Sequence, residues 1–517
     1  MKQERKPRVV IVGAGISGLS AGIYALDNGF DVSIYEKHNI AGGECTGWFR
    51  KGTYIDGCAH WVVGTNPKSD LFPLWKHIGA FDETTKIYQT EYLTKFQLKN
   101  GDIFTLYADI DKMKKEMLRC FPEDKRMINH FIRHVKLYES VQIPVAKPME
   151  YMNLFELMAL GLKMLPMAIP FAHYKHVSMD DYCAKFKNKE LGDIFKRFMP
   201  EAYNIHSFFY VCQALAMLDA GVAEGGSLQM MNRIKNTFLN KGGKLFLSQG
   251  VTHIDTEGRI AKGVTLESGE KVSADYVVTS CDMHHVLYDL LDKEHIDPYF
   301  AERFKQNGNY RIMSAVQVSF RTKKDLSSFP KMLDYLIPVT PFLAGKIDHF
   351  CIRNFSFDPL LGKNGYTSFT VLILTEEADY DYLKSLSHED YLKEKEKIGA
   401  LIKKEAVKAL GFLDEDIELL DVTTPLTYER YCNAYKGAYQ SFVTTKFSHG
   451  LMRQGEFKTL DNFIATGQWI MPPGGLPVAL FTGKHAAYRL CKMERKRFRN
   501  PEKEDVVKTK SLSTKTV

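Results

Sequence analysis

The sequence lacks the paired cysteines that would mark a metal site or a disulfide framework. Its 517 residues include nine cysteines, an odd number, and none of them forms a C-x-x-C pair. Structural zinc sites use closely spaced cysteine and histidine ligands, and disulfide-rich secreted domains use even numbers of cysteines. We therefore expect reduced thiols, no metal ligands and a cytoplasmic location.

The sequence also lacks a secretory signal and a long uninterrupted apolar run. The N-terminal residues are polar and basic and lead directly into an apolar strand, without the apolar core of a signal peptide. The most apolar segment, Leu154–Tyr174, contains Glu156, Lys163 and two prolines. We expect Pro166 and Pro170 to break a helix there, which makes the segment a poor membrane-spanning helix.

Two alternatives remain for Leu154–Tyr174. If residues 152–165 are helical, the polar residues share one face and the opposite face is apolar, with Leu154, Leu157, Met158, Leu162 and Leu165. This pattern is typical of a helix that lies in a membrane interface, and equally of a helix that covers a protein core. The first alternative predicts a peripheral membrane protein.

The body of the chain has no large excess of charge of either sign. The formal net charge is +7, but residues 489–517 hold ten Lys and Arg and only four Asp and Glu. No basic stripe interleaved with aromatic residues occurs in the body, which disfavours nucleic acid as a partner. The basic tail, residues 491–517, either binds anionic lipid or is a solvated terminus.

A dinucleotide-binding fingerprint opens the chain. The apolar run Arg8–Val12 predicts a strand, which leads into Gly13-x-Gly15-x-x-Gly18 and then into a helix and a second strand. The first glycine permits a tight turn, the second lets the backbone approach a pyrophosphate, and the third lets the helix pack on the sheet. Glu36, after the second strand, is placed to accept hydrogen bonds from a ribose. The helix N-terminus would provide amide donors to the phosphates.

Two later blocks complete the predicted domain. Residues 242–280 read as strands with hairpin turns at 257–258 and 268–269, and residues 462–466 predict a strand that precedes a helix over 478–492. Because 517 residues exceed what one core supports, we expect more than one domain. The predicted domains are 1–90, 205–285 and 420–490 for a Rossmann-type α/β domain, 91–204 and 286–419 for an inserted α+β substrate domain, and 491–517 for the tail.

Four segments resemble the superfamily of FAD-dependent amine oxidases and phytoene desaturases. The run Glu36–Gly43 resembles the loop whose glycine pair passes close to the pyrophosphate, and Gly52–Trp61 resembles the segment that leads under the flavin. The segment Gly225–Val251 resembles the return to the cofactor, where the backbone at Val251 meets the adenine. The run Ala465–Pro477 resembles the closing motif, which binds the ribityl chain and the flavin edge at a second helix N-terminus.

The resemblance implies FAD as the cofactor. The residues that would bind it are Gly13, Ala14, Gly15, Gly18, Glu36, Lys37, Gly42, Gly43, Val251, Gly467, Gly475 and Leu476. Within the superfamily, Gly57–Gly64 is similar to the branch of phytoene desaturases, carotenoid isomerases and retinol saturases, and especially to the saturases, which have a histidine at the place of His60. His60 would exchange a proton beside the flavin, because histidine titrates near neutral pH; a packed histidine is the alternative. Glu44 departs from the pattern, since many members have a basic or small residue there.

The implied function is that of an FAD-dependent oxidoreductase acting on carbon-carbon bonds of a hydrophobic polyene or isoprenoid lipid. Desaturation, saturation and isomerisation all remain open. One alternative is an amine oxidase, for which no cage of paired aromatics is recognisable beside the closing motif. Another is a non-enzymatic carrier of prenylated proteins, which the intact glycine set and Glu36 disfavour.

Four polar residues lie near the predicted crossing between the domains, namely Glu201, Tyr203, His206 and Tyr210. They either line the substrate pocket or pack in an ordinary core. We expect ordinary packing.

Overall fold

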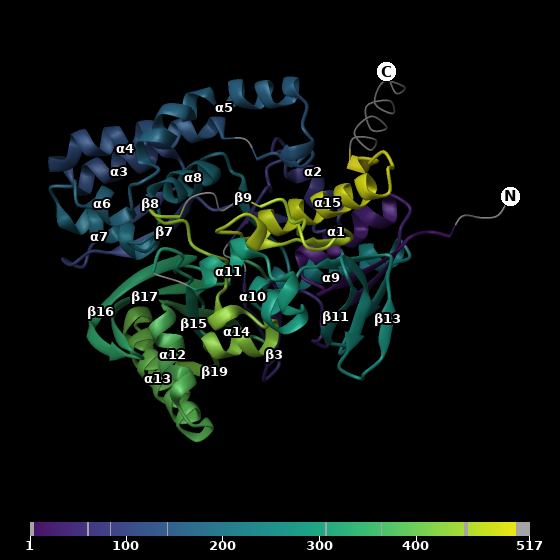
Figure 1. The fold of residues 1–517 in the computed structure, drawn as a ribbon. Helices are drawn as coiled ribbons and strands as arrows, with labels where there is room; N and C mark the ends of the chain where they lie inside the picture. The colour runs from purple at the N-terminus through teal and green to yellow at the C-terminus, as the bar shows by residue number, and fades with distance from the viewer. Residues whose placement is uncertain are drawn as a thin grey trace, which may run out of the picture.

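The computed structural model describes residues 5–58, 61–82, 84–141, 143–305, 308–362, 364–448 and 453–502. Its two largest sheets occupy different parts of the molecule (Figure 1). A parallel sheet with α1 and α15 lies on the side of the two chain ends, and a larger sheet lies beneath a group of helices on the other side.

The parallel sheet is assembled from three separate stretches of sequence. Its five strands run in the order β10 (Lys244–Phe246), β2 (Asp31–Tyr35), β1 (Arg8–Val12), β14 (Tyr276–Thr279) and β20 (Phe463–Ala465). Every neighbouring pair is parallel. The predicted strands and the discontinuous Rossmann-type α/β fold are therefore confirmed.

Both faces of the parallel sheet are covered. One face carries three helices, α1 (Ile16–Asp27), α9 (Gly226–Asn240) and α15 (Leu476–Met493). The other carries an antiparallel sheet of β11 (Val251–Glu257), β12 (Ile260–Leu266) and β13 (Lys271–Ser273). In β1, Val9 and Ile11 join the core under the helices, whereas Val10 and Val12 join the opposite core. A strand that is buried on both faces consists of a continuous run of apolar residues, and β1 could therefore be predicted from its sequence.

The larger sheet has seven strands and combines two distant stretches of sequence. Its order is β19 (Ile417–Thr423), β15 (Ser314–Thr322), β18 (Thr367–Thr375), β17 (Gly345–Asn354), β16 (Met332–Phe342), β7 (Tyr92–Gln97) and β8 (Ile103–Tyr107). Neighbours are antiparallel except β16 and β7. Residues 92–107 and residues 314–423 thus contribute strands to the same sheet. The residue boundaries of the two domains stay predictions.

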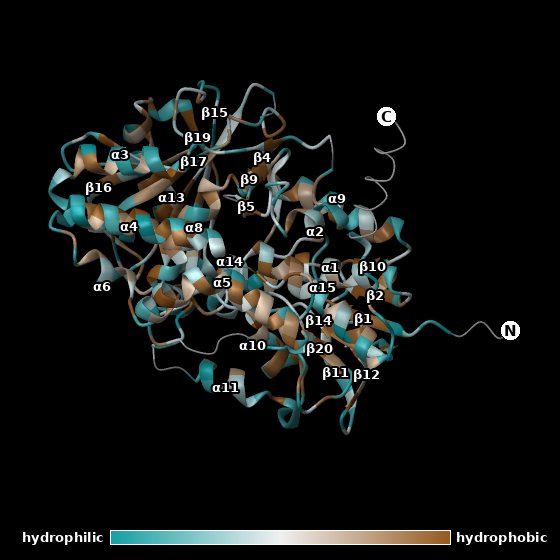
Figure 2. Ribbon diagram, turned by 90° about the horizontal axis from the view of Figure 1, so that it is seen from above, coloured by the Kyte–Doolittle hydropathy of each residue, from teal (hydrophilic) through white to brown (hydrophobic). Residues whose placement is uncertain are grey.

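Helices surround the seven-stranded sheet. One side carries α12 (Glu377–Ser385) and α13 (His388–Leu410), and the helical group above contains α3 (Ile110–Cys120), α4 (Lys125–Leu137), α6 (Met179–Cys183), α7 (Lys189–Phe198) and α8 (Ile205–Ala216). Figure 2 shows hydrophilic and hydrophobic residues alternating along α3 and α4. Phe131, Phe195 and Phe208 from three of these helices pack in one aromatic core, with tilted and edge-to-face rings. The apolar face of each helix is therefore buried against its neighbours.

Helix α5 (Leu154–Tyr174) is continuous over 21 residues and passes through Pro166 and Pro170. The prediction that the prolines break it was wrong. Each proline removes one backbone donor, but the remaining hydrogen bonds of a long helix still hold the chain in register. A capping box also fixes the start: the Asn153 side chain accepts from the Glu156 N–H at 2.9 Å, and Glu156 accepts from the Asn153 N–H at 2.8 Å.

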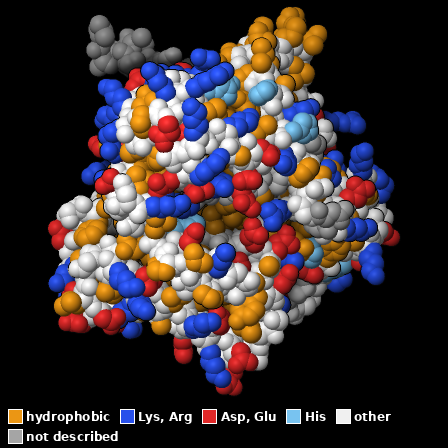
Figure 3. Space-filling view, turned by 90° about the vertical axis from the view of Figure 1, so that its left-hand side faces the viewer, with side chains coloured by type: hydrophobic (Ala, Val, Ile, Leu, Met, Phe, Trp, Pro, Cys, Tyr) orange, Lys and Arg blue, Asp and Glu red, His pale blue; other side chains and the backbone are white. Residues whose placement is uncertain are grey.

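The apolar face of α5 is exposed. Leu154, Leu162 and Ile169 are 69%, 72% and 82% exposed, and only Met167, Pro170 and Tyr174 of this helix are buried. Figure 3 shows hydrophobic side chains projecting at the upper right, at the top of the molecule where α5 lies in Figure 1. The apolar face predicted over residues 152–165 therefore covers no core among the described residues, whereas Met167 and Tyr174 farther along the helix do join one. Among the described residues, α5 is the one helix long and apolar enough to cross a membrane by length and composition.

The basic tail is described as far as Glu502. The Arg499 N–H donates to the side chain of Asn28, the C-cap of α1, at 2.7 Å, and the buried Glu502 forms an ion pair with Lys484 of α15. The first part of the tail is thus packed on α1 and α15. Residues 503–517 lie outside the described residues, so the predicted lipid binding of the tail stays a prediction.

Candidate functional site

A single cavity of about 1870 Å³ joins the glycine-rich loops to the seven-stranded sheet. Its walls include all of the predicted cofactor residues except Ala14 and Gly18. Sites for one small ligand usually measure about 300–1,000 Å³. The cavity therefore has room for a dinucleotide and for a long substrate as well.

Two glycines in and after the turn that follows β1 differ in the space around them: one has room for a ligand and the other is packed against backbone. Gly13 has a φ of +97°, which a residue with a side chain rarely adopts. A Cβ built on Gly15 would have one neighbour, the Gly42 carbonyl oxygen at 4.0 Å, whereas a Cβ on Gly18 would lie 2.1 Å from the Gly13 carbonyl oxygen. Gly15 thus faces free space at the N-terminus of α1, and Gly18 serves packing.

Glu36 is held by the protein backbone. Its carboxylate accepts from the Ala14 N–H at 2.8 Å and from the His38 N–H at 2.9 Å, and the residue is 8% exposed. Each carboxylate oxygen can accept a further hydrogen bond, so a ribose contact is still available on the cavity side. Glu36 therefore also positions the glycine loop, a role that the fingerprint alone did not predict.

Lys37 also lines the cavity, but its ammonium group contacts protein. The Nζ atom donates to the Arg430 carbonyl oxygen at 3.1 Å and hydrogen-bonds to the Asn433 side chain. The C-terminal end of α14 (Pro425–Cys432) and its cap Asn433 are thereby tied to the segment that follows β2. A contact between Lys37 and the cofactor stays a prediction.

A second helix N-terminus faces the same cavity. Gly475, with a φ of +90°, caps α15, and Leu476 begins the helix. Gly467, with a φ of +104°, donates from its N–H to the Thr482 hydroxyl at 3.1 Å. Val251, at the start of β11, completes the wall. Two helix N-termini at one cavity present backbone donors and positive dipole ends, which suit a ligand with phosphate groups.

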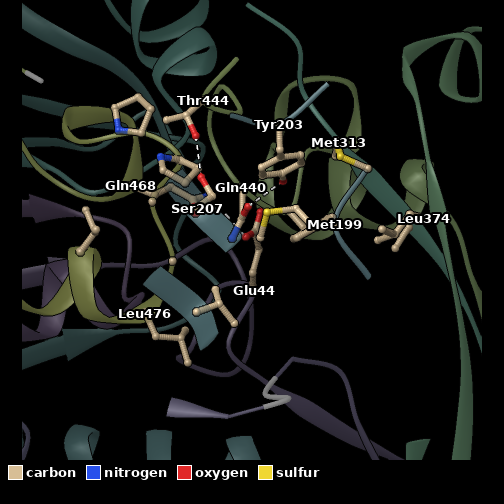
Figure 4. Close-up of a pocket in the computed structure, with 18 of the residues that line it drawn as sticks. Glu44, Met199, Tyr203, Ser207, Met313, Leu374, Gln440, Thr444, Gln468 and Leu476 are labelled. Atoms are coloured by element: carbon tan, nitrogen blue, oxygen red, sulfur yellow. Dashed lines mark hydrogen bonds between the residues drawn. The ribbon is translucent and has the colours of Figure 1, made fainter. Parts of the chain in front are cut away.

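Glu44 is a partly buried acid in the wall of this cavity. Its carboxylate accepts from the Gln468 amide at 3.4 Å and points toward Gln440 (Figure 4). Burial, with a smaller effect from the charge of Asp282, raises the pKa of Glu44 to about 8. The side chain is therefore largely neutral at pH 7 and can donate a proton. The sequence showed Glu44 only as a departure from the glycine-pair pattern.

Asp282 is a second partly buried carboxyl group in the wall. Burial raises its pKa to about 6, although the N–H groups of Tyr435, His285 and His284 donate to it and oppose the rise. No sequence motif identified Asp282, because the residues that surround it come from more than one part of the chain.

The half of the cavity beside α8 carries both polar and apolar side chains. Glu201, Tyr203, His206 and Tyr210 all line it, so the expectation of ordinary packing was wrong. The Tyr203 hydroxyl donates to the Gln440 side chain at 3.3 Å (Figure 4). Apolar side chains, labelled in Figure 4 as Met199, Met313 and Leu374, face the same space. The wall can therefore hold a hydrophobic ligand.

His60 lies outside the described residues. The described residues on either side of it, Cys58 and Trp61, both line the cavity. Proton exchange by His60 stays a prediction.

Residues 16–491 match the family of flavin containing amine oxidoreductases. The chain is 21% identical to a 4,4'-diaponeurosporene oxygenase of Staphylococcus haemolyticus, with 94% of this chain and 97% of that protein covered. It is 23% identical to a 4,4'-diapophytoene desaturase of Methylomonas sp, with 95% and 96% covered. It is 22% identical to a prolycopene isomerase of an Oncidium hybrid cultivar, with 93% and 83% covered. These alignments extend over almost the whole chain.

Solved structures with a similar fold include amine oxidases. Cyclohexylamine oxidase from Brevibacterium oxydans IH-35A has a TM-score of 0.59 and is 16% identical, with 95% of this chain and 100% of that chain covered. Putrescine oxidase bound to putrescine has a TM-score of 0.60 and is 15% identical, with 94% and 99% covered. At such identities the likeness concerns the fold alone. Together with the family match over residues 16–491, the two glycine-rich loops at one cavity establish that the chain belongs to the flavin containing amine oxidoreductase family and uses FAD.

Proposed function

We propose that the chain is an FAD-dependent oxidoreductase that acts on carbon-carbon bonds of a polyene or isoprenoid lipid. The observation that carries this proposal is the cavity of about 1870 Å³, which continues from the glycine loops past Met199, Met313 and Leu374. The desaturase, isomerase and oxygenase names of the relatives agree with a long hydrophobic substrate. When bound, FAD accepts or supplies a hydride at the substrate carbon.

The protein would bind the cofactor and the substrate, exclude water from the site and supply a proton. The backbone at Gly15 and Gly475 would hold the phosphate and ribityl parts of the cofactor, and Glu36 would hold the ribose. Saturation of a double bond requires a proton as well as a hydride. Two acids are candidates for this proton, His60 from the sequence and the neutral Glu44 from the structure. Desaturation or isomerisation would take place at the same site. The direction of hydride transfer between flavin and substrate is the subject of the following experiment.

The experiment is anaerobic reduction of the flavin followed by addition of candidate polyenes. A saturase reoxidises its flavin when the substrate is added, and the rate falls by about 10²-fold or more in the variant that lacks the general acid, His60→Ala or Glu44→Gln. A desaturase instead reduces oxidised flavin when it receives the saturated substrate. Absence of any polyene-dependent change in the flavin spectrum would refute the proposed function.

An amine oxidase is the second candidate, because the structural neighbours include two enzymes of that kind. The same spectrophotometric assay discriminates between the two. If primary amines reduce the flavin and polyenes do not, the amine oxidase assignment replaces ours. A prenyl-protein carrier without a bound flavin is the third, and a colourless purified protein would favour it.

We further propose that the protein is a peripheral membrane protein of the cytoplasm and draws its substrate from the bilayer through α5. Residues of this helix form part of the cavity wall, namely Gly161, Met164, Met167, Ala168 and Phe171. The exposed apolar face and the cavity therefore share one helix. A lipid that leaves the membrane at α5 could enter the cavity without crossing water.

Replacement of Leu157, Met158 and Leu162 by Ser should release the protein from neutral liposomes and leave the flavin spectrum unchanged. A matched control replaces exposed apolar residues elsewhere on the surface by Ser, namely Val339, Leu360 and Leu413, and should still sediment. If the native protein never sediments with liposomes, the docking proposal is wrong.

A further inference from the structure

Two cysteines face each other at the open end of a hairpin beside the glycine-rich loops. The hairpin has two strands, β3 (Gly47–Arg50) and β4 (Thr53–Asp56). Their pairing extends beyond the strands, because the Gly57 N–H donates to the Thr46 carbonyl oxygen at 3.0 Å. The next two residues outward, Cys45 and Cys58, are therefore opposite each other. Opposite residues of an antiparallel pair have Cα atoms about 4.5–5.5 Å apart, and a disulfide requires about 4.4–6.8 Å.

The two thiols also contact each other. A hydrogen bond with the Cys58 thiol, together with burial, raises the pKa of the Cys45 thiol. Cys45 is 3% exposed, whereas Cys58 is half-buried. Both are free thiols, and both line the cavity. Because the thiolate is the reactive form, Cys58 is the member of this thiol pair that reacts first from the cavity.

The segment that carries Cys45 contacts both glycine-rich loops of the cavity. The Gly42 N–H donates to the Ala14 carbonyl oxygen at 3.0 Å, and the Cys45 N–H donates to the Gly42 carbonyl oxygen at 3.1 Å. The Glu44 carboxylate accepts from Gln468 of the second loop at 3.4 Å (Figure 4). A cofactor that these two loops hold would therefore lie beside the thiol pair.

Packing alone explains Cys45 but not the thiol pair. Cys45 belongs to the core between the parallel sheet and its helices, where a small apolar side chain is sufficient. Cys58 packs only against the edge of that core and also reaches the cavity. An alanine or a valine would fill either position. Two thiols in contact on the cavity wall are what reversible disulfide formation requires.

We propose that Cys45 and Cys58 are a redox-active dithiol that passes two electrons to FAD and closes to a disulfide. In this step both S–H bonds break and one S–S bond forms. The two electrons and the two protons reduce oxidised FAD to FADH2, so the step needs no other reactant. The thiol pair would thus give the flavin a source of electrons other than the substrate. This inference goes beyond the proposed function, because it involves no polyene.

The test uses the full-length protein, freed of FAD and with all thiols reduced. One equivalent of oxidised FAD is added in the absence of oxygen, and the absorbance at about 450 nm and the thiol content are followed. The native protein should lose two of its nine thiols for each FAD that is reduced. Cys58→Ser and Cys45→Ala should bind FAD, leave it oxidised and keep all of their remaining thiols.

A third cysteine provides the matched control. Cys351 lines the same cavity, and its thiol lies 3.9 Å from the Ile352 carbonyl oxygen. Cys351→Ala should therefore reduce FAD as the native protein does, with the loss of two thiols.

A chemical oxidant tests the thiol pair independently of the flavin. Diamide takes up two electrons and two protons when it converts two neighbouring thiols to a disulfide. Arg50 and Lys51 lie between the two cysteines, so trypsin leaves Cys45 and Cys58 on separate peptides. After treatment of the native protein with diamide, mass spectrometry should find these two peptides joined, and a reductant should separate them.

Each contrary result overturns the inference. If FAD stays oxidised and the native protein keeps all of its thiols, the thiol pair does not exchange electrons with FAD. If Cys58→Ser reduces FAD as the native protein does, the electrons come from other groups. If diamide does not join the two peptides, the thiols are too far apart to form a disulfide. None of these results concerns the polyene, so the proposed function is tested separately by its own flavin assay.

Discussion

Substitution of Gly15 by Val separates cofactor binding from folding. The φ of Gly15 is −71°, which any residue adopts, and a Cβ there would have one neighbour at 4.0 Å. The protein itself therefore tolerates a side chain at this position. The added methyl groups would instead occupy the space that the pyrophosphate needs at the N-terminus of α1.

The loss of affinity can be estimated from two effects. Overpacking costs about 1–3 kcal/mol, and each lost hydrogen bond to a charged phosphate costs about 1.5–3 kcal/mol. Together they amount to about 3–6 kcal/mol, which corresponds to roughly 10²–10⁴-fold in the dissociation constant of FAD. The free energy of unfolding of the apoprotein should change by about 1 kcal/mol or less.

The assay is the ratio of absorbance at about 450 nm to that at 280 nm after gel filtration, together with an FAD titration of the apoprotein and its thermal midpoint. Gly345→Val is the matched control, because nothing lies within 4 Å of its added Cβ and its φ is not positive. It should retain the flavin. A yellow Gly15→Val protein with normal cofactor content would show that this turn does not hold the pyrophosphate.

Three further predictions follow from the same site. Gly18→Ala places a Cβ 2.1 Å from the Gly13 carbonyl oxygen, so the apoprotein itself should unfold at a lower temperature; an unchanged midpoint would contradict the packing role. Glu36→Ala removes the acceptor of the buried Ala14 N–H, and should lower the free energy of unfolding by about 1–3 kcal/mol and weaken FAD binding; an unchanged dissociation constant would exclude the ribose contact. The pKa of Glu44 is raised from 4.5 to about 8, so the folded apoprotein holds a proton that the unfolded chain has lost between these values, and its stability falls as the pH rises through this window. Glu44→Gln should flatten that decline in thermal midpoints measured from pH 5 to 8, and an identical slope in both proteins would show that Glu44 is ionised.

Local sequence rules were sufficient for the cofactor half of the protein. Backbone sterics and the burial of neighbouring residues determine the strand β1, the turn at Gly13 and the start of α1. These elements can therefore be predicted from a stretch of about thirty residues. The family resemblance then placed the closing motif, and the structure brings Gly467 and Gly475 to the same cavity. The domain boundaries and the roles of the individual cofactor residues stay predictions.

Tertiary structure alone decided the rest. The amphipathic pattern of α5 is the same whether the helix covers a core or faces solvent, and only the position of its neighbours showed that Leu162 is 72% exposed. Glu44 becomes a weak acid because burial by residues from other parts of the chain, with a smaller effect from the charge of Asp282, raises its pKa, while the hydrogen bond from Gln468 opposes the rise. Arg197 and Asp334, far apart in the sequence, meet where α7 packs on β16 and form an ion pair at 2.7 Å whose side chains are 10% and 5% exposed. The burial of a side chain and the charges around it depend on contacts between residues far apart in the chain. The hydrophobic periodicity of a sequence indicates only which residues favour burial, and it does not show what they pack against.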